Sequence, residues 1–261
     1  NTAIGYQALT TNTTGATNTA VGRSALNNNT TANNNTAVGY YSLVNNETGS
    51  NNTAIGKESL NDCTTGANNV AVGMNALSDH TTTNDNVAVG YFAMRYNTTG
   101  AQNTAVGKGA LQSNTTASYN TAVGDQALLD NTTGAECVAV GHAALFENTT
   151  ASYNTAVGNS ALRDNTTGEK NTAVGQVALE NNTTGNRNVA VGRIALYTNT
   201  TGHYNTALGQ GALYYNNADL NTSIGYESMN ATTTGAGNVA VGAYALDANT
   251  TANYNTAIGY Q

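Results

Sequence analysis

A five-residue unit, Asn-Thr-Ala-Val-Gly, constrains this chain more than any other feature of its sequence. Counted with its close variants, it occurs sixteen times in 261 residues. Successive glycines of the unit are 17 residues apart everywhere except between Gly209 and Gly225, which are 16 apart. A fixed short period of this kind predicts a solenoid, in which each repeat forms one coil and packs against the next.

Numbered from its Asn, the repeat has a fixed residue preference at most positions. Position 2 is Thr or Val, position 3 is Ala except at Ser223, position 4 is Val, Ile or Leu208, and position 5 is always Gly. Position 8 is Ala or Ser, position 9 is Leu or Met, and positions 12–15 read Asn-Thr-Thr-Gly or a close variant. Only 9% of residues are charged, but a disordered chain has no reason to keep Leu or Met at one position fifteen times.

These preferences predict an all-β parallel β-solenoid (β-roll) of about 15 coils, with two short strands per coil. We expect one strand at positions 1–4, a corner at the Gly, a second strand near positions 6–10, and a turn at positions 12–15. β-branched residues at positions 2 and 4 favour a strand and share one side of it. The Gly allows a positive φ or a close approach of another backbone. A helix would need apolar residues at i, i+3, i+4 and i+7, which the Gly and the Thr-Thr pair interrupt.

One repeat, residues 205–220, is shorter than the others by a residue. It reads Asn-Asn-Ala-Asp-Leu where other repeats have the Asn-Thr-Thr-Gly turn and its tail. A surface corner tolerates such a loss and a packed strand does not, which supports the placement of the turn. We expect residues 1–261 to form one uninterrupted array, a rod of about 70 Å at ~4.8 Å per coil. The array is interpreted as a segment of a longer fibre protein.

Stacking in register places like residues above one another. Asn over Asn at position 1 predicts a ladder of amide hydrogen bonds, and the residues of positions 4 and 9 predict continuous apolar columns. Ala at position 3 then faces outward, as a flat column of methyl groups that a second chain could meet. Because one Val and one Leu per coil bury little apolar surface, this predicts self-association, as a homotrimer or longer filament. The residues that represent these structural positions are Asn18, Ala20, Val21, Gly22 and Leu26, with Val106, Gly107 and Leu111.

The unit Asn-Thr-Ala-Val-Gly, followed by two free residues and Ala-Leu, resembles the head repeats of trimeric autotransporter adhesins. It is equally similar to repeats of bacteriophage tail fibres. The resemblance covers the whole chain, and the Asn-x-Ala-(Val/Ile)-Gly core is its most specific part. It implies a left-handed parallel β-roll, three chains side by side, and display on a cell or virion surface with adhesion as the usual task. The 17-residue coil departs from the shorter coils of the adhesins.

Composition argues against several classes of function. With eight Lys and Arg and a net charge of −7, the chain has no basic patch for nucleic acid, and no apolar run approaches the length of a membrane span. The histidines His80, His142 and His203 stand at positions 12, 6 and 16, several coils apart. Since no catalytic constellation is visible either, we expect no enzyme activity and no cofactor. Cys63 and Cys137 stand about 24 Å apart along the predicted axis, too far for a disulfide within the chain.

Three sets of side chains are candidates for binding. Asp130, Glu147 and Asp164 share position 11 in consecutive repeats, where they are weak candidates for a Ca²⁺ site or are simply solvated. The exposed tyrosines of position 17 either contact sugars or other fibres or fill half-buried corners; they are Tyr119, Tyr153, Tyr204 and Tyr254. The sequence Asn-Thr-Thr occurs ten times, as glycosylation acceptors or as turns.

The sequence therefore favours a structural role, as a rigid shaft or head of a fibre on a cell or virion surface that either holds an adhesive tip or is itself mildly adhesive. The alternative is a receptor- or glycan-binding module of a phage tail fibre. A minor alternative is an ice-binding solenoid, because Thr recurs at positions 2, 13 and 14, although position 2 is often Val.

Overall fold

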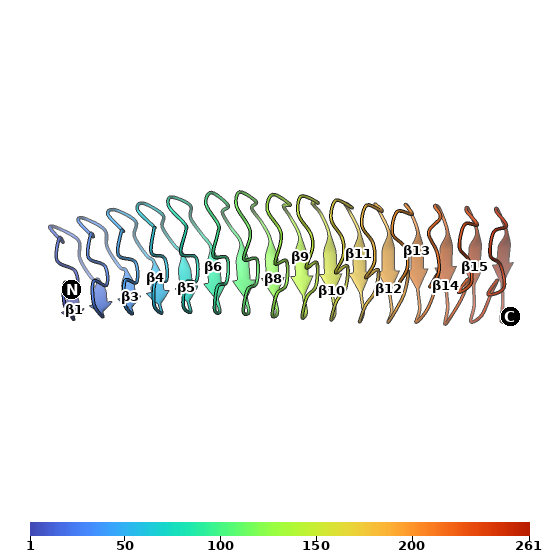
Figure 1. Cartoon of the computed structure of the whole chain (residues 1–261), viewed down its shortest axis with the longest axis horizontal. Coiled ribbons are helices and arrows are strands. Elements are labelled where there is room, and N and C mark those ends of the chain that lie inside the picture. The colour runs from blue at the N-terminus through green and yellow to red at the C-terminus, as the bar shows by residue number, and fades with distance from the viewer. The chain divides into compact units, whose positions relative to one another are not determined.

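The computed structural model describes residues 1–261 and contains strands and turns but no helix. The chain forms two compact units, Asn1–Thr133 and Gly134–Gln261, here the N-terminal and C-terminal units. Each is a parallel β-solenoid with one coil per 17-residue repeat (Figure 1). The strands of the N-terminal unit are β1 (Thr2–Ile4), β2 (Thr19–Val21), β3 (Thr36–Val38), β4 (Thr53–Ile55), β5 (Val70–Val72), β6 (Val87–Val89), β7 (Thr104–Val106) and β8 (Thr121–Val123). Those of the C-terminal unit are β9 (Val138–Val140), β10 (Thr155–Val157), β11 (Thr172–Val174), β12 (Val189–Val191), β13 (Thr206–Leu208), β14 (Thr222–Ile224), β15 (Val239–Val241) and β16 (Thr256–Ile258).

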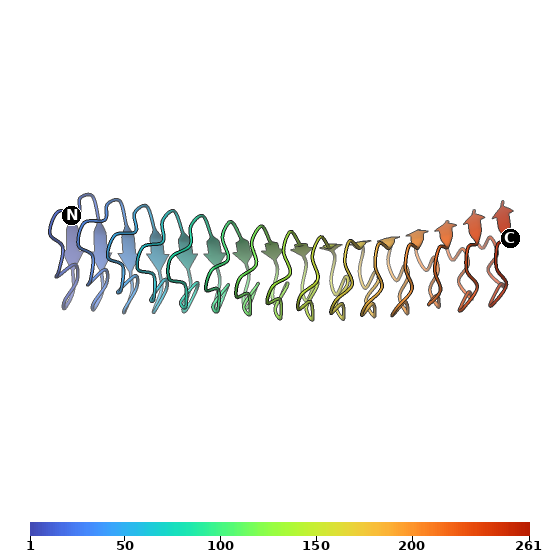
Figure 2. The same ribbon diagram turned by 90° about the horizontal axis from the view of Figure 1, so that it is seen from above.

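Within each unit, every strand pairs in parallel with the strand of the next coil, in the order of the chain. In the N-terminal unit Ala105 of β7 lies beside Ala122 of β8, and in the C-terminal unit Ala156 of β10 lies beside Ala173 of β11. Seen from above, the strand arrows of each unit follow one another in a single row (Figure 2). Like therefore lies beside like, which confirms the predicted stacking of successive repeats.

Each coil contains only one strand, of three residues, so the expected second strand is wrong. Positions 6–10 form consecutive turns in which positions 7 and 9 have positive φ, such as 54° at Ser160 and 52° at Leu162. Extended strands require negative φ. The turns are still tied to the next coil, since the Leu162 N–H donates to the Ala178 carbonyl at 3.0 Å. Leucine is uncommon in this left-handed conformation, so the residue types did not indicate it.

The core of each coil consists of Ala at position 3, Ala or Ser at position 8 and Leu or Met at position 9. Burial of Leu26 and Leu111 confirms the prediction for position 9, since both have 0% exposure. The prediction for the strand was wrong, because it placed position 4 inside the coil and position 3 outside. Ala20 is fully buried, whereas Val21 is half-buried and Val106 is 37% exposed. A coil already filled by leucine has room for one methyl group per strand rather than for two larger side chains, and the alternation of a strand turns the others outward.

Two columns of buried asparagine connect successive coils. At position 1 the Asn154 Oδ1 accepts the backbone N–H of Asn171 at 2.9 Å, and its Nδ2 donates to the position-15 carbonyl of Gly168 at 2.8 Å. At position 12 the Asn182 Nδ2 donates directly to Asn165 Oδ1 at 2.7 Å. The ladder of amide hydrogen bonds expected at position 1 thus runs mainly along position 12. The position-1 side chains instead bond mainly to backbone groups.

Asn18 makes the two hydrogen bonds described above for position 1, and the position-5 glycines have a backbone conformation that suits Gly. Asn18 accepts the N–H of Asn35 at 2.9 Å and donates to the Ala32 carbonyl at 2.8 Å. Gly22 and Gly107 have φ of 133° and 140°. A Cβ on Gly107 would also lie 2.3 Å from the carbonyl oxygen of Gly124 in the next coil. Both reasons predicted for this glycine, a positive φ and a close approach, therefore hold at once.

The one-residue deletion lies in an exposed corner, as predicted. In the short coil the Asn216 Nδ2 donates to the carbonyl of Ala218, two residues on, at 2.9 Å. In complete coils the same amide reaches three residues on, as from Asn199 to Gly202 at 3.1 Å. The buried asparagine keeps its place and the corner absorbs the loss.

Candidate binding surfaces

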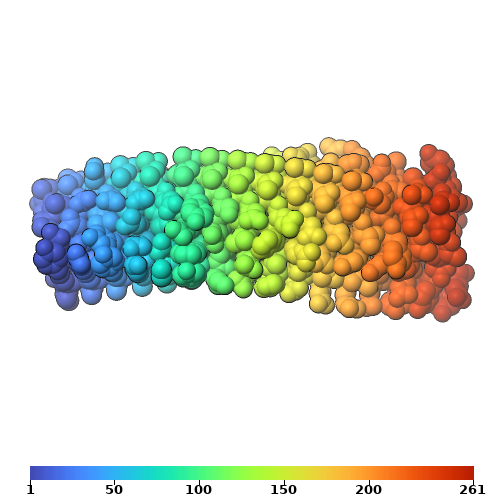
Figure 3. Space-filling model, in the orientation of Figure 1, coloured from blue at the N-terminus to red at the C-terminus, as the bar shows by residue number.

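The outer face of the sheet in each unit carries an apolar column that its own coils cover only in part. It consists of the position-4 residues, and the position-2 residues form a second column of Thr and Val beside it. Val157 and Val174 of the C-terminal unit are 36% and 37% exposed, and they lie side by side on β10 and β11. The space-filling view shows that each part of a unit's surface is built from consecutive repeats (Figure 3). A continuous, partly exposed apolar column of this kind is a candidate contact site.

Position 17 forms a second candidate surface, made of aromatic and cationic side chains. All four tyrosines proposed there from the sequence are exposed, Tyr153 and Tyr204 by 51% and 50%, and Tyr119 and Tyr254 by more. Lys170 and Arg187 occupy the same position in the two coils between Tyr153 and Tyr204. The Lys170 Nζ lies 5.7 Å from the centre of the Tyr153 ring, and the Arg187 guanidinium lies 5.3 Å from that of Tyr204.

A groove of about 450 Å³ opens beside these cations, and we call it the position-17 groove. Its side chains come from three consecutive coils of the C-terminal unit. They are Thr167, Glu169, Lys170, Asn186, Arg187, His203 and Tyr204. The position-16 residues of the groove are held by hydrogen bonds between consecutive coils. Asn186 Oδ1 accepts the Glu169 N–H at 2.6 Å, and His203 Nδ1 accepts the Asn186 N–H at 3.0 Å. Sequence reasoning found Tyr204 but missed the cations beside it, although all three share one position.

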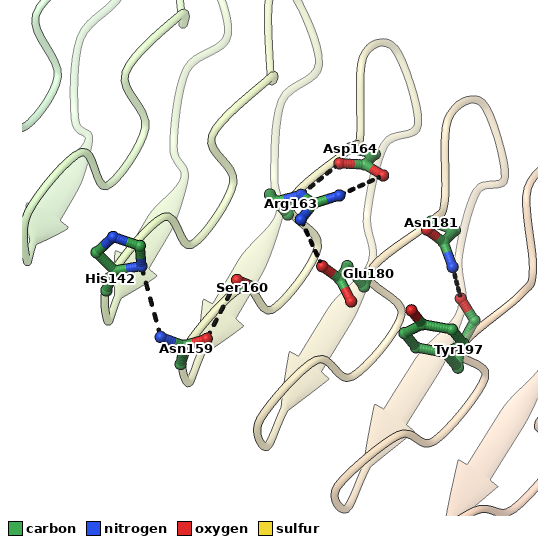
Figure 4. Close-up of polar contacts among 8 residues, drawn as sticks. All are labelled: His142, Asn159, Ser160, Arg163, Asp164, Glu180, Asn181 and Tyr197. Atoms are coloured by element: carbon green, nitrogen blue, oxygen red, sulfur yellow. Dashed lines mark hydrogen bonds and ion pairs between the residues drawn. The ribbon is translucent and has the colours of Figure 1, made fainter.

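The position-11 carboxylates are not gathered into a metal site. Arg163 contacts both oxygens of Asp164, at 2.7 and 3.1 Å, and also lies 2.8 Å from Glu180 (Figure 4). The Arg163 guanidinium thus supplies beside Asp164 the positive charge that a bound Ca²⁺ would have supplied. Burial raises the pKa of Glu180, and Arg163 partly opposes this shift. Burial likewise raises the pKa of Asp130. No group of three or more His, Cys, Asp or Glu, with or without Glu147, is placed to hold a metal ion.

Other side chains near this network make contacts of ordinary structural kind. Asn159 Nδ2 lies 3.5 Å from His142 Nδ1, and the Ser160 hydroxyl donates to Asn159 Oδ1 at 3.2 Å (Figure 4). One coil further on, the Asn181 Nδ2 donates to the Tyr197 carbonyl at 2.9 Å (Figure 4). The first and third of these contacts join neighbouring coils, whereas the Ser160–Asn159 bond lies within one coil.

Cys63 and His80 form a buried pair that sequence reasoning overlooked. They replace the position-12 Asn in two consecutive coils, so the shared position was the available signal. Both side chains are fully buried. Burial raises the pKa of the Cys63 thiol to about 12 and lowers that of His80 to about 4. Both groups are therefore neutral at pH 7, and neither a thiolate nucleophile nor a protonated imidazole is present. Cys137, at position 1, is also buried, and its thiol is directed to the Ala151 carbonyl at 3.4 Å.

Replacing Cys63 by Asn should stabilise the N-terminal unit. Asn46 Oδ1 is buried without a hydrogen-bond donor, because the Cys63 thiol in the next coil is directed to the Gly66 carbonyl at 3.5 Å. An amide at this position would donate to that oxygen, which is worth about 1–2 kcal/mol. Urea unfolding of the full chain measures the gain. Cys63→Ser is the control, since a hydroxyl lacks the reach of the amide, and equal stability of the two variants would contradict the explanation.

His80 should make the N-terminal unit sensitive to acid. Its Nδ1 lies 2.7 Å from Thr83 Oγ1, and its Nε2 lies 3.3 Å from the Asn69 amide nitrogen, which leaves no place for a second ring proton. Because the pKa falls from 6.5 to about 4 on folding, the unfolded chain binds more protons between these values. Stability is therefore full above pH 6.5 and declines as the pH falls to 4, by about 3 kcal/mol. Stability measured against pH should lose this slope in His80→Asn, and an unchanged slope would contradict the assignment.

The asparagines of the Asn-Thr-Thr corners are mostly buried and are therefore not accessible acceptors. Eight of the ten asparagines have 0% exposure, and only those of the first and last complete coils, Asn12 and Asn249, are half-buried. Their Nδ2 atoms donate to the next corner residue and to the neighbouring Asn, as Asn114 does to Ala117 at 3.0 Å and to Asn97 at 2.7 Å. A glycan on such an amide has no path to the surface of the folded coil.

Comparisons with protein-family models, curated proteins and solved structures find no match to this chain. No helix with the length and hydrophobicity to cross a membrane is present. The function is therefore inferred from the surfaces described above.

Proposed function

We propose that this chain is a structural repeat region of an extracellular fibre, on a cell or virion surface, which self-associates as a homotrimer or longer filament. The proposal gives it a mechanical rather than an enzymatic role. The observation that supports it is the apolar position-4 column, which every coil repeats and no coil fully covers.

The chemistry of this column suits contact between copies of the chain. Val157 and Val174 are in register along the sheet, so a second copy can meet the same spacing with its own column. Burial of apolar area drives such contact, and only 9% of residues are charged, so few like charges oppose it. The contact expected through the position-3 alanines is replaced in this proposal, because those methyl groups lie inside the coil.

The oligomeric mass in solution tests the proposal. The chain has a mass of 26.6 kDa, and light scattering should give about three times this value or more for the unaltered protein. The double variant Val157→Lys/Val174→Lys places charge on the column and should yield the single-chain mass. Thr150→Lys/Thr184→Lys adds the same charge at exposed corners and should leave the assembly intact. A single-chain mass for the unaltered protein at high concentration would overturn the proposal.

Ice binding is a second candidate, favoured by one observation. The Thr and Val side chains of positions 2 and 4 project from the same face, with neighbouring strands in register, as Thr155 and Thr172 do on β10 and β11. Position 2 is Val in five of the sixteen repeats, so the Thr column is interrupted. Thermal hysteresis of a freezing solution should be present if this face orders water, and its absence would remove the candidate.

A further inference from the structure

We propose that the position-17 groove binds a saccharide that carries a carboxylate, such as the acidic sugar of a surface glycan. The groove combines three features that such a ligand needs. These are cations for the carboxylate, fixed polar groups for the hydroxyls, and an exposed aromatic ring for the apolar face of a sugar.

The cations are concentrated here against the composition of the chain. Lys170 and Arg187 are two of only eight Lys and Arg residues in a chain of net charge −7, and no other repeat has a cation at position 17. Lys170 leans toward Tyr153 in the preceding coil, whereas Arg187 leans toward Tyr204 in the following coil. The two side chains therefore diverge and leave the space between them open. Arginine binds carboxylates through two parallel hydrogen bonds, which gives the site its preference for this group.

The remaining charge in the groove limits how much negative charge the ligand can carry. Glu169 is the only acidic side chain of the lining, so the groove has one excess positive charge. One carboxylate matches that excess, whereas a polyanion would meet Glu169. The exposed Glu169 carboxylate is instead suited to accept hydrogen bonds from sugar hydroxyls.

His203 is set to act as a hydrogen-bond donor. Its Nδ1 accepts the backbone N–H of Asn186 at 3.0 Å, so the neutral ring carries its proton on Nε2. Its own backbone N–H is bound by Asp219 Oδ1 at 2.7 Å, which further fixes its place. Beside it, the Tyr204 hydroxyl accepts a hydrogen bond from Arg187 Nη1. The ring of Tyr204 is half-exposed and offers a flat apolar surface to the C–H face of a sugar.

The backbone under these side chains is already ordered. Lys170, Arg187 and Tyr204 all have φ near +60° (60°, 58° and 58°). The Arg187 and Tyr204 N–H groups each donate to the position-16 carbonyl of the preceding coil at 3.0 Å. A site built on fixed backbone loses little conformational entropy on binding, and a volume of about 450 Å³ is ordinary for a small-molecule site.

This inference rests on the proposed surface fibre only in that a displayed chain would meet glycans, since the groove itself lies within three coils of one chain. The test uses the full chain and four sugars, 3′-sialyllactose and methyl glucuronide as acidic probes with one carboxylate each, and lactose and methyl glucoside as their neutral counterparts. Acetate represents a carboxylate without a sugar. Titration calorimetry and ligand-observed NMR should show at least one acidic probe binding about tenfold more tightly than its neutral counterpart and than acetate.

Variants then assign the binding to the groove. Arg187→Gln and Lys170→Gln should each weaken the acidic probe about tenfold, and Tyr204→Ala should weaken it by a similar factor. Arg193→Gln removes the same charge from an exposed residue outside the lining and should leave affinity unchanged. Circular dichroism checks that each variant stays folded, since the two altered cations are exposed.

Three results would overturn the proposal. They are no binding of either acidic probe at ~10 mM, equal binding of acetate, and an equal loss of affinity in Arg193→Gln. Failure of the fibre proposal is a separate result, because a single-chain mass together with selective binding of 3′-sialyllactose would retain the groove and discard self-association. A trimer that binds no acidic sugar would do the reverse.

Discussion

Substituting Ala for Gly158 should destabilise the C-terminal unit by more than about 3 kcal/mol. Gly158 has φ of +138°, and a Cβ built on it lies 2.4 Å from the carbonyl oxygen and 2.6 Å from the carbonyl carbon of Gly175. The first feature strains an alanine backbone, and the second forces two coils apart at a point where both partners are backbone. Neither can be relieved by a side-chain rotation.

Thermal unfolding should register this substitution as a fall in Tm of roughly 10 °C for a unit of this size. Gly168→Ala is a matched control in the same repeat. Its added Cβ would also start 2.4 Å from a carbonyl oxygen, that of Gly185, but its φ is not in the left-handed region. Four repeats already carry Ala at this position, namely Ala32, Ala117, Ala151 and Ala252. The coil can therefore adjust to Ala at position 15, and a fall in Tm as large as that of Gly158→Ala would contradict the argument.

Truncating Leu162 to Ala should cost about 2–5 kcal/mol. Leu162 has 0% exposure and belongs to the position-9 column, the largest side chain that each coil places inside. Its removal leaves a cavity bounded above and below by other leucines, and the hydrogen bond of its N–H to the Ala178 carbonyl holds the backbone in place around that cavity. Little collapse is possible, so the cost should lie in the upper part of the range.

Val157→Ala in the adjacent β10 strand is the natural comparison, because Val157 is 36% exposed. It removes a comparable apolar group from the outer face and should cost under about 1 kcal/mol in the single chain. Urea unfolding at a concentration where the chain is unassembled measures both variants. If Val157→Ala proved the more damaging, the assignment of inside and outside on the strand would be reversed.

The period alone predicted most of the architecture, and the reason is physical. The Gly of each repeat is explained by a positive φ and a close backbone approach that both recur once per coil. Gly107 shows both, with φ of 140° and its approach to Gly124. The buried Leu column follows from the same regularity. What the sequence did not decide was the face of a three-residue strand. Thr104, Ala105 and Val106 alternate in or out according to how much space the rest of the coil leaves, and a strand this short carries no further residues to mark its register.

The turns at positions 6–10 were missed because the residue types at these positions do not indicate their conformations. Ser160 and Leu162 both adopt positive φ, and neither residue favours it. The candidate groove was missed for a different reason. Apart from Thr167, its polar residues stand at variable positions, where composition looks random along the chain. Only stacking in register brings Lys170, Arg187 and Tyr204 together. The same holds for the buried pair of Cys63 and His80.

The short coil of residues 205–220 has a consequence for how such an array changes in evolution. A slip of the gene by three times seventeen nucleotides adds or removes one whole coil, and each column of Gly, Leu and Asn closes over the change. A smaller slip inside β10 would turn every later side chain of that strand to the opposite face. At the corner the same small slip is harmless, as Asn216 and Ala218 demonstrate. The array should therefore evolve by gain or loss of whole coils, and single-codon deletions should be tolerated only at the corners.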